Sequence, residues 1–413
     1  MRVIVIGAGI VGLCVGWHLA RQGAEVMVLD GAAPGSGASS GNAGAISAGS
    51  VAPLAMPGVL RQVPTMLADP KGALHIPFGY WLRAMPWLWQ FVASARPAQV
   101  QATAQALSTL MFGAMERHRE ILAAEGALGL IRDTGQLYLY RDHAQYAKDA
   151  ESWALRQQHG MRLELLEGQG AIQALEPDIR GDYQLGVFLP DQGSSVNPQR
   201  QAEVVAQGIR RMGGQVLCQE VRAILNADHR VIGVRTAEGE MRADYVVAAA
   251  GAFSARLLTP LGIRVPLESQ RGYHVMLPDA GISLSRPVVP ADRKVFISPM
   301  EMGLRVAGTV EFGGLDRPPT PRRAALLLED LRRVFPQALS EGMAGFWMGH
   351  RPCLPDSLPV VGPVKAWPGL WCAFGHGHLG LTGSAPTGAL LAAAMLGPQP
   401  NVDLSAFAVE RFS

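Results

Sequence analysis

The first thirty residues alternate between apolar runs and glycines in a pattern that predicts a βαβ unit. Residues 2–6 form a β-branched apolar run that is typical of a central parallel strand. Residues 10–22 have the apolar spacing of a helix that ends at Gly23, and residues 25–29 form a second strand that leads to Asp30. Strand, glycine loop, helix, strand and acid together predict a dinucleotide-binding unit.

The three glycines of this unit have separate physical roles. Gly7 permits the tight turn, Gly9 lets backbone N–H groups approach a pyrophosphate, and Gly12 lets the helix pack close to the strand. Asp30 stands 18 residues after Gly12, where a carboxylate can accept hydrogen bonds from both hydroxyls of an adenosine ribose. The alternative is a solvated acid at a strand end. Since NAD and FAD share this half of the molecule, the unit does not separate them.

Residues 31–50 contain too many Gly, Ser and Ala to build a core. Because this loop follows the ribose-binding strand directly, we expect it to lie against the cofactor through its backbone donors, with Ser39, Ser40, Asn42 and Gly44 facing the ligand. A flexible linker is the alternative.

Further along the chain, the pattern mixes helices and strands. Residues 51–130 read as mainly helical, with breaks at Pro57, Pro64, Pro70, Pro77, Pro86 and Pro97. Strands are predicted at 136–140, at 185–190, near Val216, Ala223 and Val231, and at 245–249, and helices at 197–212 and 322–335. The strand at 245–249 ends in the small residues Ala249, Ala250 and Gly251, which would let a ligand approach the backbone closely. The alternative is a core strand that ends in a turn.

An aromatic segment at residues 76–92 contains Arg83 and has Arg61, Lys71 and Arg96 on either side. Trp and Tyr with basic neighbours suit a bilayer interface, so the segment predicts peripheral membrane contact. In the alternative, Trp81, Met85, Leu88 and Val92 pack inward at helical spacing. Residues 51–130 contain no run long enough to span a membrane.

The C-terminal region predicts a strand, a second glycine loop with Gly375, Gly377 and Gly380, and a helix of small residues. A second ribose acid does not follow, so a second dinucleotide is not expected. A helix N-terminus offers positive potential to a ligand, and a reduced flavin carries negative charge. This match favours FAD over NAD. Upstream, Arg351 is stiffened by three following prolines and suits a bidentate grip on a carboxylate, with a structural arginine as the alternative.

Bulk properties narrow the classes of function. The 413 residues suggest two lobes, and a net charge of +2 without long basic runs gives no indication of nucleic acid binding. The four cysteines lie far apart with no metal-ligand spacing, so we expect no metal site, reduced thiols and a cytoplasmic location, extended to the inner face of the membrane if the aromatic segment binds there.

The motifs resemble those of the D-amino acid oxidase superfamily of FAD enzymes, and within it the bacterial D-amino acid dehydrogenases. The resemblance covers nearly the whole chain and rests on GAGIVG with Asp30, SSGNAGAIS, AAAGAFS, RGYHVMLP, RPCLPDSLPVVG and GHGHLGLT. It implies an α/β fold. A Rossmann-type FAD-binding domain would comprise residues 1–50, 197–262 and 351–413, and an α+β substrate domain on a mixed sheet would comprise 51–196 and 263–350.

The resemblance also implies the site. Arg351 would grip the substrate carboxylate, and Tyr273 would line the same pocket. His376 and His378 of the glycine loop are candidates for hydrogen bonds near flavin or substrate, with a structural role as the alternative. Arg271 in place of a lysine, and Gly41 before Asn42, depart from the dehydrogenase pattern. The expected contacts to noncovalent FAD are Gly7, Gly9, Ile10, Val11, Gly12, Asp30, Ser39, Ser40, Asn42, Ala43, Gly44, Ile46, Val221, Ala250, Gly251, Gly377, His378, Leu379, Gly380, Leu381 and Thr382.

The implied reaction is oxidative deamination of a D-amino acid, in which hydride passes from Cα to flavin N5 and gives an imine, then a 2-oxo acid. Electrons would pass to a quinone or other carrier, with oxygen as the oxidase alternative. Two further alternatives stay open. One is a dehydrogenase for an imino acid or secondary amine such as hydroxyproline, proline or sarcosine, and the other is a non-catalytic flavin-binding subunit of a larger complex.

Overall fold

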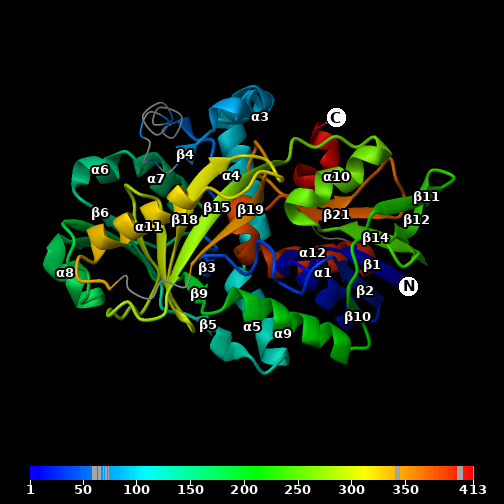
Figure 1. Ribbon diagram of the computed structural model, residues 1–413, viewed down its shortest axis with the longest axis horizontal. Helices are drawn as coiled ribbons and strands as arrows, with labels where there is room; N and C mark the ends of the chain where they lie inside the picture. Colours follow the sequence, from blue (N-terminus) through cyan, green and yellow to red (C-terminus); the bar gives the residue numbers. More distant parts are fainter. Residues whose placement is uncertain are drawn as a thin grey trace.

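The computed structural model describes residues 1–57, 63, 67, 69, 72, 74–339, 345–397 and 403–412. Figure 1 shows these residues in two lobes, one of which contains both chain ends. Arg61, Pro64, Pro70 and Lys71, which entered the sequence predictions, lie outside the described residues.

A six-stranded sheet forms the centre of the lobe that contains the termini. Its strand order is β10 (Gln215–Cys218), β2 (Glu25–Asp30), β1 (Arg2–Ile6), β14 (Tyr245–Ala248), β21 (Leu370–Phe374) and β20 (Val360–Pro363). All neighbours pair in parallel except β20, which is antiparallel to β21. Every strand lies within the segments predicted for the FAD-binding domain. The predicted boundary at residue 51 is nonetheless wrong for Leu107, Leu110 and Met115, which pack into the core of this lobe although they belong to the segment 51–196.

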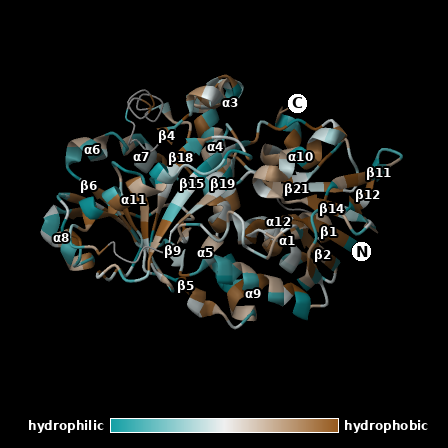
Figure 2. Ribbon diagram, in the orientation of Figure 1, coloured by the Kyte–Doolittle hydropathy of each residue, from teal (hydrophilic) through white to brown (hydrophobic). Residues whose placement is uncertain are grey.

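Both faces of this sheet are covered, as a parallel sheet requires. Val3 and Val5 of β1 belong to the core with α1 (Ile10–Arg21), α9 (Pro198–Arg211) and α12 (Gly380–Leu396), whereas Ile4 and Ile6 face the opposite core. That second core includes the small sheet of β11 (Ala223–Ala227), β12 (Arg230–Arg235) and β13 (Glu240–Arg242), and α10 (Ser254–Leu258). The buried strands β1, β2 and β14 are accordingly hydrophobic in Figure 2.

The helix α12 is long and apolar. Together with the turn before it, over residues 377–396, it is the one helix among the described residues with the length and composition to cross a membrane. It packs against α1, α4 (Pro97–Met111) and α5 (Ala114–Ala124), and 61% of its most apolar window is buried. Its apolar character therefore has an explanation in the core of this lobe.

A nine-stranded mixed sheet forms the second lobe. Its order is β19 (Phe346–Cys353), β15 (Glu268–Leu277), β18 (Gly303–Phe312), β17 (Phe296–Met300), β16 (Val288–Pro290), β6 (Gln136–Tyr140), β8 (Leu185–Leu189) and β7 (Glu164–Glu167), and β4 (Leu74–His75) pairs with β18. The helix α11 (Pro321–Val334) covers one face of β15 and β18 (Figure 1). Residues of the opposite face line a large cavity.

Other elements lie outside these two large sheets. They are α3 (Trp81–Ser94), α6 (His143–Ala147), α7 (Ala150–Gln158), α8 (Gly168–Leu175), and a small sheet of β3 (Ala45–Ile46), β9 (Gly193–Ser195) and β5 (Ile131–Arg132).

The helix α3 corrects two sequence predictions. Pro86 lies inside this helix instead of ending it. The N–H that proline lacks would bond the carbonyl of Leu82, and Leu82 is 91% exposed, so water can take that place. The predicted inward face is also shifted. Ala84 and Trp87 are the buried residues, whereas Met85 and Val92 are exposed.

Candidate active site

A cavity of about 1740 Å³ is lined by residues of both lobes. This volume exceeds the range of about 300–1,000 Å³ that is common for sites of small ligands, so the cavity has room for a dinucleotide and a substrate together. The glycine loop of β1 and α1 lies at one part of the lining, and Arg351 of β19 at another.

The nucleotide part of the cavity is organised by Asp30. Its carboxylate accepts hydrogen bonds from the backbone N–H groups of Ala8 (2.7 Å) and Ala32 (3.0 Å). Ser39 Oγ accepts from Ile10 N at 2.9 Å, at the first turn of α1. The loop 31–50 is therefore tied to the start of the helix and does not behave as a separate linker.

The three glycines are placed as their spacing predicts. A Cβ on Gly7, whose φ is +113°, would collide with the Ala249 carbonyl, and one on Gly12 would collide with the Gly7 carbonyl. A Cβ on Gly9 would have Ser39 Oγ as its nearest neighbour, at 3.6 Å, so this backbone borders the open cavity. A cradle of this kind, at a helix N-terminus and beside an acid, fits the diphosphate and ribose of a dinucleotide.

Most predicted cofactor residues line the cavity, and four do not. Ser40 donates its hydroxyl to Ser36 O (3.1 Å) and Gly37 O (2.9 Å), and Ile46 is fully buried in the core. Gly12 and Gly44 also lie outside the lining. The predicted residues that do line it are Gly7, Gly9, Ile10, Val11, Asp30, Ser39, Asn42, Ala43, Val221, Ala250, Gly251, Gly377, His378, Leu379, Gly380, Leu381 and Thr382.

The second glycine loop brings the N-terminus of α12 to the cavity through a short 3-10 turn at Gly377–Leu379. Thr382 Oγ1 accepts a hydrogen bond from Ser47 N at 3.0 Å, which joins this loop to the loop after β2. His376 Nε2 is 2.9 Å from Thr387 Oγ1, and burial lowers the pKa of His376 to about 4.

The side chain of His378 is exposed, and the surface that it exposes lies inside the cavity. Burial, followed by the charges of Arg351 and Arg156, lowers the pKa of His378 to about 4. Its imidazole is therefore neutral at pH 7 and carries one N–H donor and one acceptor.

Arg351 reaches from β19 across β15 to β18. Its Nη1 donates to Thr309 O at 2.8 Å and its Nη2 to Gly308 O at 3.4 Å. The guanidinium passes directly over Gly272, where a Cβ would lie 2.5 Å from Nη1 and closer still to Nη2 and Cζ. Only glycine leaves this path open.

A β-bulge presents those two carbonyls. Arg271 pairs with Glu311 and Tyr273 pairs with Gly308, so the single residue Gly272 faces both Thr309 and Val310. Thr309 has a φ of +58°, which is uncommon for a β-branched residue, and its buried Oγ1 has no hydrogen-bond partner in the described chain. Backbone strain of this kind concentrates at functional sites.

The positive charge of Arg351 is not neutralised by the described residues. No carboxylate contributes to its electrostatic environment, in which burial lowers the pKa below the usual arginine value. Arginine nonetheless stays charged. A cation removed from water is stable only with an anion or other strong acceptor, so the site is suited to a carboxylate from a ligand.

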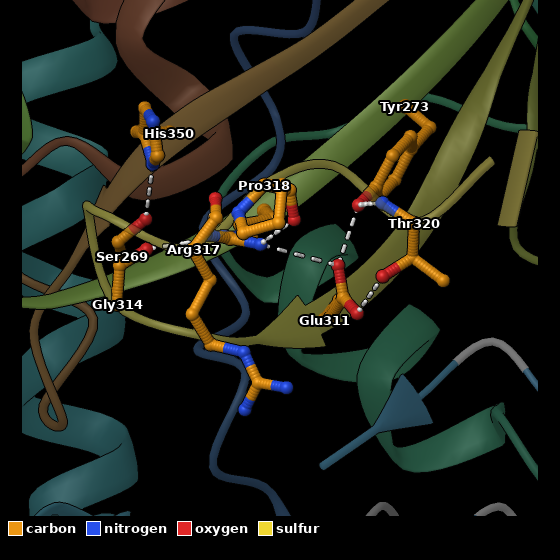
Figure 3. Close-up of polar contacts among 9 residues, drawn as sticks. Ser269, Tyr273, Glu311, Gly314, Arg317, Pro318, Thr320 and His350 are labelled. Carbon is orange, nitrogen blue, oxygen red and sulfur yellow. Dashed lines mark hydrogen bonds and ion pairs between the residues drawn. The ribbon is translucent and has the colours of Figure 1, made fainter. Parts of the chain in front are cut away.

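Tyr273 lies among the lining residues, but its hydroxyl points to Glu311 and Thr320 (Figure 3). The hydroxyl donates to Glu311 Oε2 at 2.5 Å and accepts from Thr320 N at 2.9 Å. Arg271 is buried on the same side and donates to the carbonyls of Gly314, Arg317 and Pro318. Arg271, which replaces the lysine of the dehydrogenase pattern, therefore stabilises the loop at residues 314–318 and does not contact the cavity.

Three residues that sequence patterns did not indicate also shape the lining. Trp347 stacks on His274 with ring centroids 5.1 Å apart, and it occupies the space where a side chain at position 41 would stand. Gly41 and Trp347 are therefore a matched pair. Glu220 and Arg222 flank Val221 near the nucleotide part. None of these three residues belongs to a motif or a regular spacing, so the sequence alone did not identify them.

The buried thiols lie outside the lining of the cavity. Burial raises the pKa of Cys14 and Cys353 to about 12 and also raises that of Cys372, so these thiols are protonated and weakly nucleophilic. Cys218 is exposed. Noncovalent FAD remains the prediction that these positions favour. Among the described residues, no group of three His, Cys, Asp or Glu is placed to hold a metal ion.

The sequence profile of the FAD dependent oxidoreductase family matches residues 2–394. The chain belongs to this family. Two curated relatives cover it fully, namely a D-amino-acid oxidase of Bradyrhizobium diazoefficiens, 35% identical, and a D-amino acid dehydrogenase of Paramagnetospirillum magneticum, 31% identical; each alignment spans 99% of the relative. The solved L-proline dehydrogenase of P. horikoshii superimposes with a TM-score of 0.74 at 18% identity, over 100% of this chain and 97% of that one.

Family membership confirms the predicted family, fold class and cofactor. The protein is an FAD-dependent oxidoreductase with a Rossmann-type lobe and a mixed-sheet lobe. The open backbone at Gly9, the acid at Asp30 and the α12 N-terminus are the features that fit FAD.

Proposed function

We propose that the protein catalyses oxidative deamination of D-amino acids. The observation that supports this most directly is the Arg351 guanidinium, which lies in the cavity without a carboxylate partner among the described residues and beside the glycine loop of α12. The names of the two curated relatives support a D-amino acid as the substrate class. The cavity lined by both lobes favours an enzyme over a subunit that only carries flavin.

The side chains of the site act mainly by orientation. Arg351 binds the substrate carboxylate bidentately and is itself held by the Thr309 and Gly308 carbonyls, which fixes the position of Cα. The neutral imidazole of His378, which is exposed to the cavity, is available to the amino group. FAD, which the Gly9 backbone, Asp30 and the α12 N-terminus would hold, would supply the two-electron acceptor for the hydride of Cα. Water then hydrolyses the imine to a 2-oxo acid and ammonia.

We also propose a quinone or other carrier as the electron acceptor. Trp81, Leu88 and Phe91 of α3 line the cavity, so an apolar wall extends toward the surface. A lipid-soluble quinone matches that chemistry. Steady-state rates with a soluble quinone and with oxygen alone separate the two acceptors. Faster turnover with quinone, without stoichiometric hydrogen peroxide, supports the proposal, and equal turnover with oxygen and full peroxide yield contradicts it.

A third proposal concerns membrane contact at the cytoplasmic face. Phe78, Leu82 and Trp89 are 96%, 91% and 68% exposed, and exposed Arg83 and Arg96 provide charge for anionic lipid. Sedimentation with anionic vesicles tests this contact. We expect Leu82→Glu to reduce co-sedimentation while the deamination rate in solution is unchanged. Failure of the wild-type protein to sediment with these vesicles would contradict membrane contact and leave the proposed reaction intact.

The proposed reaction is tested by anaerobic addition of D-amino acids to the holoenzyme. Loss of the oxidised flavin absorbance with D-amino acids, and not with their L-enantiomers, supports the assignment. The same panel includes D-proline, hydroxyproline and sarcosine, because reduction by these alone would favour the secondary-amine alternative. Flavin that stays oxidised with every compound would contradict catalysis of this kind.

Arg351→Ala tests the role of the guanidinium. Because a charged hydrogen-bonded pair and the orientation of Cα are lost together, we expect KM to rise and kcat to fall, with a decrease in kcat/KM of about a hundredfold or more. Arg351→Lys should recover only part of the loss, since lysine lacks the bidentate geometry. Unchanged kinetics in Arg351→Ala would remove this residue from the site.

A further inference from the structure

We propose that the cavity contains a second anion-binding subsite, formed by Arg156 and Lys294, which selects D-amino acids with an acidic side chain. This subsite is distinct from Arg351 and rests on the proposed function, because it assumes that Arg351 holds the α-carboxylate.

Arg156 places an incompletely paired cation in the cavity wall. It belongs to α7 and lines the cavity, and its guanidinium lies over the Trp153 ring with Cζ 4.7 Å from the ring centroid. The side chain is hydrogen-bonded to Tyr138, but its buried Nε has no hydrogen-bond partner among the described residues. A buried N–H without a partner costs free energy unless a ligand supplies an acceptor.

Lys294 adds a second cation from a different element. It ends the turn between β16 and β17 with a φ of +54°, a left-handed conformation that is uncommon for lysine. The side chain of Lys294 is exposed to the space of the cavity. The surrounding protein removes part of its water, and this burial lowers the pKa of Lys294. A desolvated ammonium with open space in front of it is suited to a carboxylate.

The register of the sheet places Lys294 close to Arg351. Phe296 pairs with Ala307, and Val295 packs directly over Gly308. Lys294 therefore follows next to Thr309, whose carbonyl holds the Arg351 guanidinium. Lys294 and the Arg351 guanidinium thus both lie beside Thr309, and both residues line the cavity, so one small diacid is placed to contact both cations.

The remaining charge near the subsite does not cancel these cations. Asp149 is the acid that lines this part of the cavity; its charge raises the pKa of Lys294 against the effect of burial, and its Oδ2 accepts from the Tyr140 hydroxyl at 3.0 Å. Arg156, Lys294 and Arg351 thus face one described carboxylate, and the charges of Arg156 and Arg351 both act on His378. The excess of positive charge matches an amino acid with two carboxylates. The other acids of the lining, Asp30 and Glu220, lie at the nucleotide part.

The first experiment compares D-glutamate with its neutral isostere D-glutamine on the wild-type holoenzyme. We expect kcat/KM for D-glutamate to exceed that for D-glutamine by about tenfold or more, because a charged hydrogen bond to each cation is lost with the amide. The same order is expected for D-aspartate over D-asparagine. Equal values, or a preference for the amides, would overturn the acidic-side-chain assignment while leaving D-amino acid oxidation intact.

Variants separate the subsite from the rest of the cavity. In Lys294→Met we expect kcat/KM for D-glutamate to fall about tenfold to a hundredfold, with D-glutamine changed by less than about threefold. Arg156→Gln should act in the same direction. Lys294→Glu should shift preference toward D-lysine. The matched control is Lys148→Met, an exposed lysine outside the lining. Equal losses for D-glutamate and D-glutamine in both subsite variants would overturn the proposal.

A binding measurement keeps the test independent of turnover and of variant folding. Glutarate has two carboxylates and no amine, and butyrate has one carboxylate. Titration of the wild-type holoenzyme, followed by the flavin spectrum, should give about tenfold tighter binding for glutarate. Equal affinities would overturn the second subsite. If no amino acid reduces the flavin but glutarate still binds more tightly, the proposed reaction fails and the diacid subsite stands.

Discussion

Gly272→Ala should reduce activity by displacing Arg351 without touching the cofactor. The new Cβ would stand 2.5 Å from Nη1, whereas non-bonded atoms settle at about 3.5 Å, so the guanidinium must move by about 1 Å. A displacement of that size in a group that positions a substrate costs about a hundredfold in rate. Gly272 does not have a positive φ, so the backbone accepts alanine and the FAD content should stay at the wild-type level.

The assay is kcat/KM with the best D-amino acid, together with bound FAD per chain. Gly170→Ala is the matched control, because this glycine lies in α8 with no atom within 4 Å of an added Cβ. It should keep full activity and gain up to about 1 kcal/mol of stability. A double-mutant cycle gives the decisive comparison. Gly272→Ala should have little further effect in an Arg351→Ala background, and an undiminished effect there would refute the mechanism.

Three further predictions concern the cofactor, the support network and acid stability. Asp30→Ala should weaken FAD binding about tenfold to a hundredfold, measured by flavin fluorescence titration; unchanged affinity would contradict the ribose contact. Tyr273→Phe should lower the free energy of unfolding by about 1–3 kcal/mol, because Glu311 and Thr320 N lose a buried partner, while kcat falls less than about threefold; a large loss of kcat with unchanged stability would instead assign the hydroxyl to catalysis. Stability should fall as pH drops from about 6.5 to 4, because burial lowers the pKa of His18, His118, His274 and His376 to about 4 and only the unfolded chain binds protons in that window. His118→Gln should flatten the dependence of Tm on pH, and an unchanged slope would contradict the assignment.

Local patterns predicted the nucleotide-binding unit closely. The predicted helix at 10–22 is α1 at Ile10–Arg21, and Asp30 ends β2 as expected. The strand at 136–140 also matches β6. In these segments the apolar period, the glycines and the terminal acid indicate the same structure, and each signal lies within a few residues of the element it specifies.

The substrate side of the cavity was less accessible to sequence reasoning. Arg351 could be identified because a proline-rich motif surrounds it, but Arg156 and Lys294 resemble ordinary surface cations in sequence. Their environment depends on which strands of the nine-stranded sheet are neighbours. The bulge at Thr309 is likewise a product of pairing between β15 and β18. Tyr273 illustrates the converse, because its motif indicates a pocket residue but the alternation along β15 directs its hydroxyl to Glu311.

The order of strands in the six-stranded sheet has a consequence for synthesis of the chain. The ribosome produces β1, α1 and β2 first, yet β14 is completed only at Ala248, and β21 and α12 follow after residue 370. Until β14 is complete the sheet has an open edge beside β1, and until α12 follows, α1 lacks the helix that packs against it. Because α12 completes the cofactor cradle only with the last tenth of the sequence, we expect flavin capture to follow synthesis of the chain, whereas the edge of β1 is exposed to aggregation until β14 pairs with it.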